Sequence, residues 1–208
     1  PQPYVNEFCR LYQLLATQHH ESLAAANHLA GEVVDPATAN ADAVWGVLWN
    51  KPLFANARVA AATNWINQLE PHMANAWEVW GTDAFQIVRN GPGIAAQNFT
   101  LQGTEEGLIA PIGQTTVPKH RLFYIQGAAQ MLRARAENAE RPFAALVNEP
   151  LTVESLRQLQ AEFGPGWGPI TVLHALTDFG VAVKPDLHLV RSIQHLGFVP
   201  DLPPNLQV

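Results

Sequence analysis

Apolar residues recur three or four positions apart in three stretches of the chain, which is the spacing of one face of an α-helix. The three series are Val5, Phe8, Cys9, Tyr12 and Leu15; Val59, Ala62, Ile66 and Leu69; and Leu122, Ile125, Ala129 and Leu132. A sustained alternation of apolar and polar residues with hairpin turns, which would indicate paired strands, does not stand out. The pattern predicts an all-α protein in which Cys9 is buried as a small hydrophobic residue.

Glycine and proline gather between residues 90 and 118, where no helical period holds. Both residue types mark turns and loops. We therefore expect a long loop there, or a boundary between a helical half at about 1–90 and a second half at about 118–197. Both halves would belong to one domain covering 1–208.

Helix start and stop signals are sharpest in the last third of the chain. They predict a helix over 152–163, a glycine-built turn over 164–168 and a second helix over 169–179. An extended segment over 181–185 follows, and Asp186 then caps a third helix.

The turn has the sequence Gly164-Pro165-Gly166-Trp167-Gly168 and lies directly before Pro169. Glycines permit positive φ angles and leave backbone N–H groups uncovered. Beside the N-terminus of the second helix such groups bind anions, and a DNA phosphate is a natural occupant. The alternative is an ordinary helical corner with a glycine cap.

The Gly-x-Gly turn, the helix after it, the extended apolar segment and the Asp that opens the next helix resemble the helix-hairpin-helix superfamily of DNA glycosylases. The run Asp186-Leu187-His188-Leu189-Val190-Arg191 is similar to the endonuclease III type, and the superfamily includes glycosylases for 8-oxoguanine and alkylated purines. The resemblance covers residues 118–197. It implies two closely packed helical halves with a base pocket between them.

The activity that the resemblance implies is hydrolysis of the N-glycosidic bond of a damaged or modified base flipped out of DNA, with an oxidised or alkylated purine favoured. Asp186 would stabilise the positive charge that develops on the sugar and orient a water; its alternative role is a plain helix cap. Bifunctional members carry a lysine at the position of Ile170, so we predict an enzyme without lyase activity. Lys184 is either a substitute amine or a phosphate contact.

The resemblance also implies a set of binding residues. Those expected to bind DNA lie in the turn, at its flanks and on a basic helix before it: Gly166, Trp167, Gly168, Thr171, Lys119, His120, Arg121 and Lys184. Those expected to line the base pocket are Ile170, His174 and His188, the first two sharing a helix face at spacing i and i+4. The glycosylases for 8-oxoguanine and alkylpurines use other residue pairs there.

Five tryptophans lie in the first half of the chain: Trp45, Trp49, Trp65, Trp77 and Trp80. Most are expected in the core, and one or two could stack on a base.

Charge modifies this picture in two ways. The net charge of −6 argues mildly against a nucleic-acid partner, since such affinity rests largely on neutralising phosphates. Against this, Lys119, Arg121, Arg133 and Arg135 follow one another with no acidic residue between them. They predict a local basic face or, alternatively, a solvated helix face.

Several chemistries lack their signatures. One cysteine allows neither an intramolecular disulfide nor a four-cysteine iron–sulfur cluster, and no zinc-binding, P-loop or Gly-x-Ser-x-Gly motif occurs. We therefore expect no metal and no cofactor. No apolar run reaches 18 residues and the N-terminus lacks signal-peptide features, so we expect a cytoplasmic, nucleoid-associated monomer that binds DNA and no membrane.

Three alternatives stay open. The first is an antiviral glycosylase that excises a bulky modified phage base, such as glucosylated hydroxymethylcytosine. The second is a bifunctional glycosylase/lyase that uses Lys184. The third is a non-catalytic module that uses the hairpin only to hold DNA or a protein. The acidic net charge favours this alternative, and Asp186 before a helix with Arg191 disfavours it.

Overall fold

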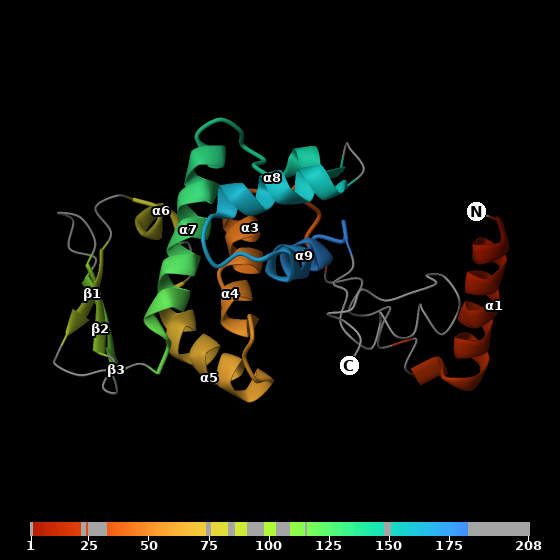
Figure 1. The fold of residues 1–208 in the computed structure, drawn as a ribbon, viewed down its shortest axis with the longest axis horizontal. Coiled ribbons are helices and arrows are strands. Elements are labelled where there is room, and N and C mark those ends of the chain that lie inside the picture. Colours follow the sequence, from red (N-terminus) through yellow and green to blue (C-terminus); the bar gives the residue numbers. More distant parts are fainter. Residues whose placement is uncertain are drawn as a thin grey trace. The chain divides into compact units, whose positions relative to one another are not determined.

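The protein is described by a computed structural model over the following residues: 2–21, 24, 33–73, 76–82, 86–90, 98–102, 109–114, 116–147 and 151–182. The chain forms two compact units, one of Pro1–Val33 with Lys184–Val208 and one of Val34–Val183. In the first unit the structure describes helix α1 (Gln2–Gln18). The other labelled elements in Figure 1 belong to the Val34–Val183 unit.

Helix α1 confirms the first predicted helical stretch. The prediction that Cys9 is buried is wrong, because its thiol is free and exposed. Tyr12 and Leu14 on the same helix are also exposed. Apolar spacing identifies one face of a helix, but it does not establish that another element covers this face.

The first helices of the Val34–Val183 unit are short. They are α3 (Ala41–Leu48), α4 (Lys51–Phe54), α5 (Val59–Leu69), the 3-10 turn η1 (Glu70–His72) and α6 (Trp77–Trp80). Helix α3 starts at Asn40, whose Oδ1 accepts the N–H of Ala43 at 3.0 Å. Such a cap satisfies one of the free donors at a helix start.

The tryptophans of these helices are mostly core residues, as predicted. Trp45, Trp49 and Trp80 are buried, and Trp65 and Trp77 are half-buried. The indole N–H of Trp45 donates to the backbone carbonyl oxygen of Met73, directly after η1, at 2.7 Å, so the buried ring also has its polar atom satisfied.

A three-stranded antiparallel sheet occupies part of the predicted loop. Its strands are β1 (Gln86–Asn90), β2 (Asn98–Gln102) and β3 (Ile109–Gln114), in the order β1-β2-β3. The helical prediction is therefore wrong for β1, at the end of the first predicted half, and the loop prediction is wrong for β2 and β3. All three strands lie inside the Val34–Val183 unit. Strands of five or six residues are too short for a clear alternation, and Pro111 is tolerated because β3 is an edge strand.

Helix α7 (Lys119–Ala136) is the centre of this unit and contacts α3, α4, α6 and α8. Its buried apolar side chains are those of the predicted stripe and its neighbours: Leu122, Ile125, Ala128, Ala129, Met131 and Leu132. Helix α6 approaches closely at Gly81, where a Cβ atom would lie only 2.7 Å from the carbonyl oxygen of Ala129.

The chain then passes through the 3-10 turn η2 (Ala144–Val147) to the helices α8 (Val153–Phe163) and α9 (Pro169–Asp178). Both predicted helices are confirmed, and so is the glycine turn between them (Figure 1). The side chains of Thr152 and Ser155 form a capping box at the start of α8. Apart from the three strands, the described residues confirm the predicted helical class.

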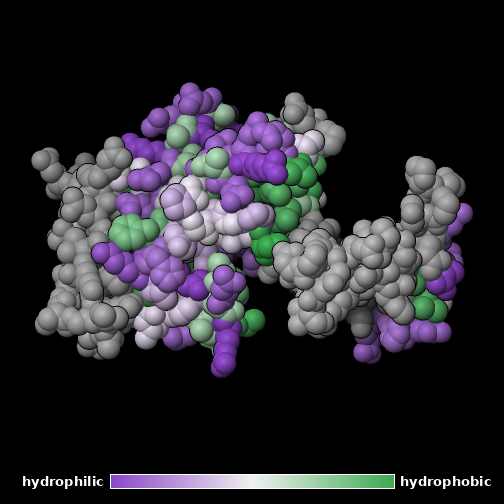
Figure 2. Space-filling model, viewed as in Figure 1, coloured by the Kyte–Doolittle hydropathy of each residue, from purple (hydrophilic) through white to green (hydrophobic). Residues whose placement is uncertain are grey.

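The surface of the Val34–Val183 unit mixes hydrophilic and hydrophobic side chains in the view of Figure 2, with a hydrophobic area over α8 and α9. Among the helices that the structure describes, none is both long enough and apolar enough to cross a membrane.

Candidate nucleic-acid interface

The turn between α8 and α9 presents free backbone donors. Gly166 has a φ of +85°, and Gly168 takes an extended conformation that caps α9, with Pro169 in the first helical position. Within the described part of the chain, the N–H groups of Gly166, Gly168 and Ile170 have no hydrogen-bond acceptor. Unpaired donors at a helix N-terminus carry partial positive charge and can bind an anion.

Tight packing holds the turn in place. The backbone of Gly166 lies against the ring of Tyr124, where a Cβ atom would come within 2.1 Å of Cδ1. The indole of Trp167 is only 1% exposed, stacks on Phe163 at 4.1 Å and donates to the Tyr124 carbonyl oxygen at 2.9 Å. The prediction that the Trp167 side chain contacts DNA is therefore corrected. The side chain is buried and anchors the turn in the core.

Arg121 is also built into the core. Its guanidinium donates to the carbonyl oxygens of Pro52 at 2.5 Å, Leu53 at 3.1 Å and Ala55 at 2.7 Å, and it lies over the ring of Trp65. Burial lowers the pKa of Arg121 from its ordinary value. The predicted role of Arg121 in binding DNA is corrected: it holds the end of α4 instead.

The side chains of three other predicted contacts differ in accessibility. Thr171 is buried, and therefore it cannot offer its hydroxyl to DNA as predicted. Lys119 is exposed, with its ammonium 5.4 Å from the centre of the Phe123 ring. His120 is exposed, with its ring 5.5 Å from that of Tyr124. Among the described residues, Lys119 and His120 are thus the predicted basic contacts that can still reach a ligand.

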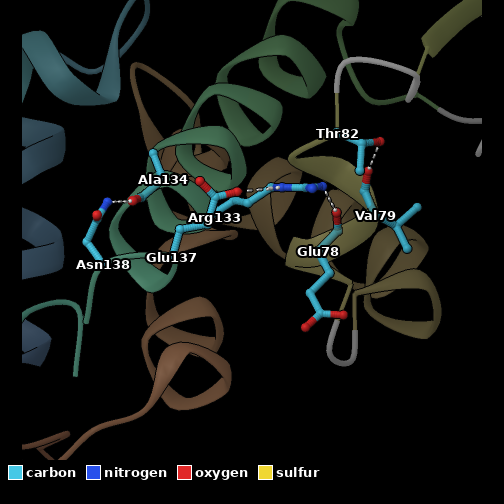
Figure 3. Close-up of polar contacts among 7 residues, drawn as sticks. All are labelled: Glu78, Val79, Thr82, Arg133, Ala134, Glu137 and Asn138. Carbon is cyan, nitrogen blue, oxygen red and sulfur yellow. Dashed lines mark hydrogen bonds and ion pairs between the residues drawn. The ribbon is translucent and has the colours of Figure 1, made fainter. Parts of the chain in front are cut away.

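The predicted basic face does not form. Arg133 donates to the Oε1 of Glu137 at 3.5 Å and to the backbone carbonyl of Glu78 at 3.3 Å, so it bridges α7 and α6 (Figure 3). Arg135 donates to Glu162 Oε2 through two nitrogens, at 2.9 and 2.5 Å. These arginines join helices of the unit to one another and do not form a patch for phosphates.

A cavity of about 310 Å³ lies beside the glycine turn. It is lined chiefly by residues from the α4–α5 loop, the start of α7 and the turn: Asn56, His120, Arg121, Tyr124, Gly166 and Gly168. Asn56 has a φ of +52°, a conformation that asparagine adopts more readily than most other residues. The sequence reasoning missed Asn56 and Tyr124, because neither belongs to a recognisable motif.

One face of α9 packs towards α4. It carries Ile170, which is 48% exposed, and the half-buried His174, whose ring meets that of Phe54 edge-on at 5.6 Å. One turn further along, Asp178 forms an ion pair with Lys51, whose side chain is only 6% exposed. The predicted shared face of Ile170 and His174 exists, and Phe54 and the ion pair are additions that the sequence did not indicate.

The remaining predicted site residues, Lys184, Asp186 and His188, lie outside the described residues. Asp186 follows Ala182, the last described residue, by four positions. The described residues contain no group of three or more His, Cys, Asp or Glu side chains that could hold a metal ion. Comparison with protein-family models, with curated proteins and with solved structures gives no match for this chain.

Proposed function

We propose that the chain is a DNA glycosylase that hydrolyses the N-glycosidic bond of a damaged or modified base flipped out of DNA. An oxidised or alkylated purine is the favoured substrate, and Asp186 is the catalytic carboxylate. The turn would act as the hairpin of a helix-hairpin-helix motif.

The observation that carries the proposal is the free backbone at the start of α9. The N–H groups of Gly166, Gly168 and Ile170 have no acceptor among the described residues, and the exposed side chain of Lys119 lies on the helix that packs against α8. Backbone amides hold a phosphate independently of the base sequence, which suits an enzyme that must search DNA. Because the arginines of α7 are engaged elsewhere, these amides would carry most of the contact.

The chemistry requires a carboxylate near the sugar. When the bond between C1′ and the base nitrogen breaks, the electron pair leaves with the base and positive charge develops on the sugar ring. An ionised Asp186 would stabilise that charge and accept a proton from the attacking water, whose oxygen then bonds to C1′. Asp186 opens a predicted helix, and a helix N-terminus favours the ionised carboxylate.

The face of α9 that follows the turn supplies the proposed base-binding groups. Ile170 offers an exposed apolar surface, and His174 with Phe54 offers ring edges and faces. Aromatic side chains bind an unstacked base by stacking, and a histidine can also hydrogen-bond to its edge. Because Ile170 has no amine, the reaction would proceed by hydrolysis and not through a Schiff base.

Excision from a panel of modified duplexes tests the proposal. The panel contains 8-oxoguanine, alkylated adenine, uracil and glucosylated hydroxymethylcytosine, and released bases are identified by mass spectrometry. We expect release of one base by the wild-type chain and none by Asp186→Asn, which should still bind DNA.

The outcomes separate the alternatives. Release of the glucosylated base would assign the enzyme to defence instead of repair. Undiminished release by Asp186→Asn would remove Asp186 from the mechanism. No release from any duplex, with DNA still bound, would indicate a non-catalytic module.

A further inference from the structure

The cavity beside the turn lies apart from the face of α9 assigned to the base. Its volume of about 310 Å³ is at the lower end of the range for small-molecule sites, about 300–1,000 Å³. This volume suits one nucleotide-sized group and not a dinucleotide. Asn56, His120 and Tyr124 contribute to its lining, whereas Ile170 and His174 do not.

The walls of the cavity offer aromatic surface and one amide. The rings of His120 and Tyr124 lie 5.5 Å apart and are tilted by 60°, so they present two differently oriented faces. Both residues lie on α7, and the exposed Asn56 comes from another element, the loop between α4 and α5. Planar rings stack on a nucleobase, and a carboxamide both donates to and accepts from its edge.

Arg121 contributes a positive charge to the lining of the cavity. It is 7% exposed, and its guanidinium is held by the carbonyl oxygens of α4 and Ala55, so it acts through its charge and not by direct contact. No carboxylate pairs with Arg121 among the residues that the structure describes. The lining also includes Gly166 and Gly168, whose N–H groups have no acceptor in the part of the chain that the structure describes. A positive charge held in the lining, next to amides without acceptors among the described residues, favours an anionic group.

We propose that this cavity binds a single nucleotide, with its phosphate at Gly166 and Gly168, its base against His120 and Tyr124, and the base edge at Asn56. The nucleotide is either an unstacked residue of a DNA strand or a free mononucleotide. The site uses the amides of Gly166 and Gly168, as the proposed hairpin does, but it does not require Asp186. It can therefore exist whether or not the chain excises a base.

Calorimetric titration of the 208-residue chain tests the site directly. The probes are deoxyadenosine 5′-monophosphate, deoxyadenosine, inorganic phosphate and a short single-stranded oligodeoxyadenylate. The mononucleotide or the oligonucleotide should bind at least about tenfold more tightly than deoxyadenosine or phosphate, because only they engage both parts of the cavity. Binding of the mononucleotide identifies a free ligand, and binding of the oligonucleotide alone identifies a DNA strand.

Three variants remove the contacts one at a time. Asn56→Gly deletes the amide at a positive φ that glycine readily adopts. His120→Ala deletes an exposed ring. Gly168→Glu places a negative charge where no atom lies within 4 Å of the added Cβ. Gly46→Glu is the matched control, because Gly46 is likewise unobstructed but lies on α3.

Asn56→Gly and His120→Ala should each weaken binding about fivefold, and Gly168→Glu about tenfold or more, while Gly46→Glu leaves it unchanged. Three results would overturn the site: no binding of either nucleotide probe, equal binding of inorganic phosphate, or changes below about twofold in all three variants. These titrations measure binding and not excision. A failure of the chain to excise any base from the duplex panel would therefore leave the test of this site unaffected.

Discussion

The ring of Tyr124 lies directly on the backbone of Gly166, so that no side chain can be added to this glycine without moving the ring. Gly166 also has a φ of +85°, which L residues rarely adopt. Two independent constraints, one steric and one conformational, thus require glycine at the tip of the turn.

Substitution at Gly166 should therefore destabilise the protein, whereas substitution at Gly168 should not. Gly166→Ala combines an unfavourable positive φ with overpacking against Tyr124, and we expect a loss of about 2–4 kcal/mol in unfolding free energy. Gly168 has an ordinary φ of −71° and open space around its Cβ position, so Gly168→Ala should be neutral or slightly stabilising. Urea unfolding followed by tryptophan fluorescence measures both, since all six tryptophans lie in the Val34–Val183 unit.

A double substitution separates the two constraints at Gly166. In a Tyr124→Ala background the clash is absent and only the backbone strain remains, so Gly166→Ala should cost about 1–2 kcal/mol there. An unchanged cost in that background would show that the ring does not restrict Gly166.

Arg121→Lys should destabilise the unit even though the charge is kept. The guanidinium reaches three carbonyl oxygens at the end of α4, and an ammonium on a shorter side chain cannot reproduce this fan of donors. Hydrogen bonds to charged groups contribute about 1.5–3 kcal/mol each, so we expect a loss of roughly 2–4 kcal/mol in the same unfolding assay. A loss below about 0.5 kcal/mol would mean that these three hydrogen bonds contribute little to the stability of the unit. Lys119→Arg, at an exposed position on the same helix, serves as the control.

Variants of the ion pair between Lys51 and Asp178 should differ in unfolding free energy, with the single variant Asp178→Asn less stable than the double variant. Asp178→Asn leaves the buried ammonium of Lys51 without its counter-charge and should cost about 2 kcal/mol, less than for a fully buried pair because the Asp178 side chain is 40% exposed. Adding Lys51→Met to Asp178→Asn removes the uncompensated charge and should recover part of that loss. A double variant that is as unstable as the sum of its singles would contradict this explanation.

An amine placed at Ile170 should create the lyase chemistry that the wild type is proposed to lack. Ile170 is 48% exposed near the start of α9, so a lysine fits without a cavity or a clash. With a DNA substrate that the enzyme cleaves, Ile170→Lys should form a Schiff base at C1′ that borohydride traps as a covalent adduct. Val153→Lys is the matched control, at an exposed apolar position near the start of α8.

An adduct with the wild type would contradict the hydrolytic mechanism and point to Lys184. Excision without any adduct in Ile170→Lys would show that this face of α9 does not approach the sugar.

Local signals in the sequence were sufficient for the helices that carry their own boundaries. Helix α8 begins after Thr152 and ends at Gly164, and α9 is followed by Gly180, which has a positive φ. Capping hydrogen bonds and glycine conformations depend on a few neighbouring residues, so they can be read from the chain directly. The strands β1 to β3 pair with their neighbours along the chain, but each has only five or six residues, and they were missed because such short strands show no clear alternation.

In the candidate site, too, local features were predictable from the sequence and packing between distant residues was not. The turn was found because its glycines are local, but the burial of Trp167 and Arg121 was not, because both residue types also serve as DNA contacts. The pair of Lys51 and Asp178 joins residues 127 positions apart, a separation at which a single sequence gives no indication of contact. Residue type therefore suggested the chemistry, and packing decided which side chains remain available for it.

The backbone N–H of Val34 donates to the carbonyl oxygen of Asp178 at 3.0 Å, which links the first residue of the Val34–Val183 unit to the end of its last described helix. The chain thus enters and leaves this unit at neighbouring points, as it does in a domain inserted into a host sequence. A segment whose two ends lie together can be inserted into a gene, or removed from it, as one piece of coding sequence, because only its two boundaries are joined to the rest of the chain. The helices α3 to α9, with the glycine turn, therefore lie in one continuous segment of the chain whose two ends are joined by a hydrogen bond.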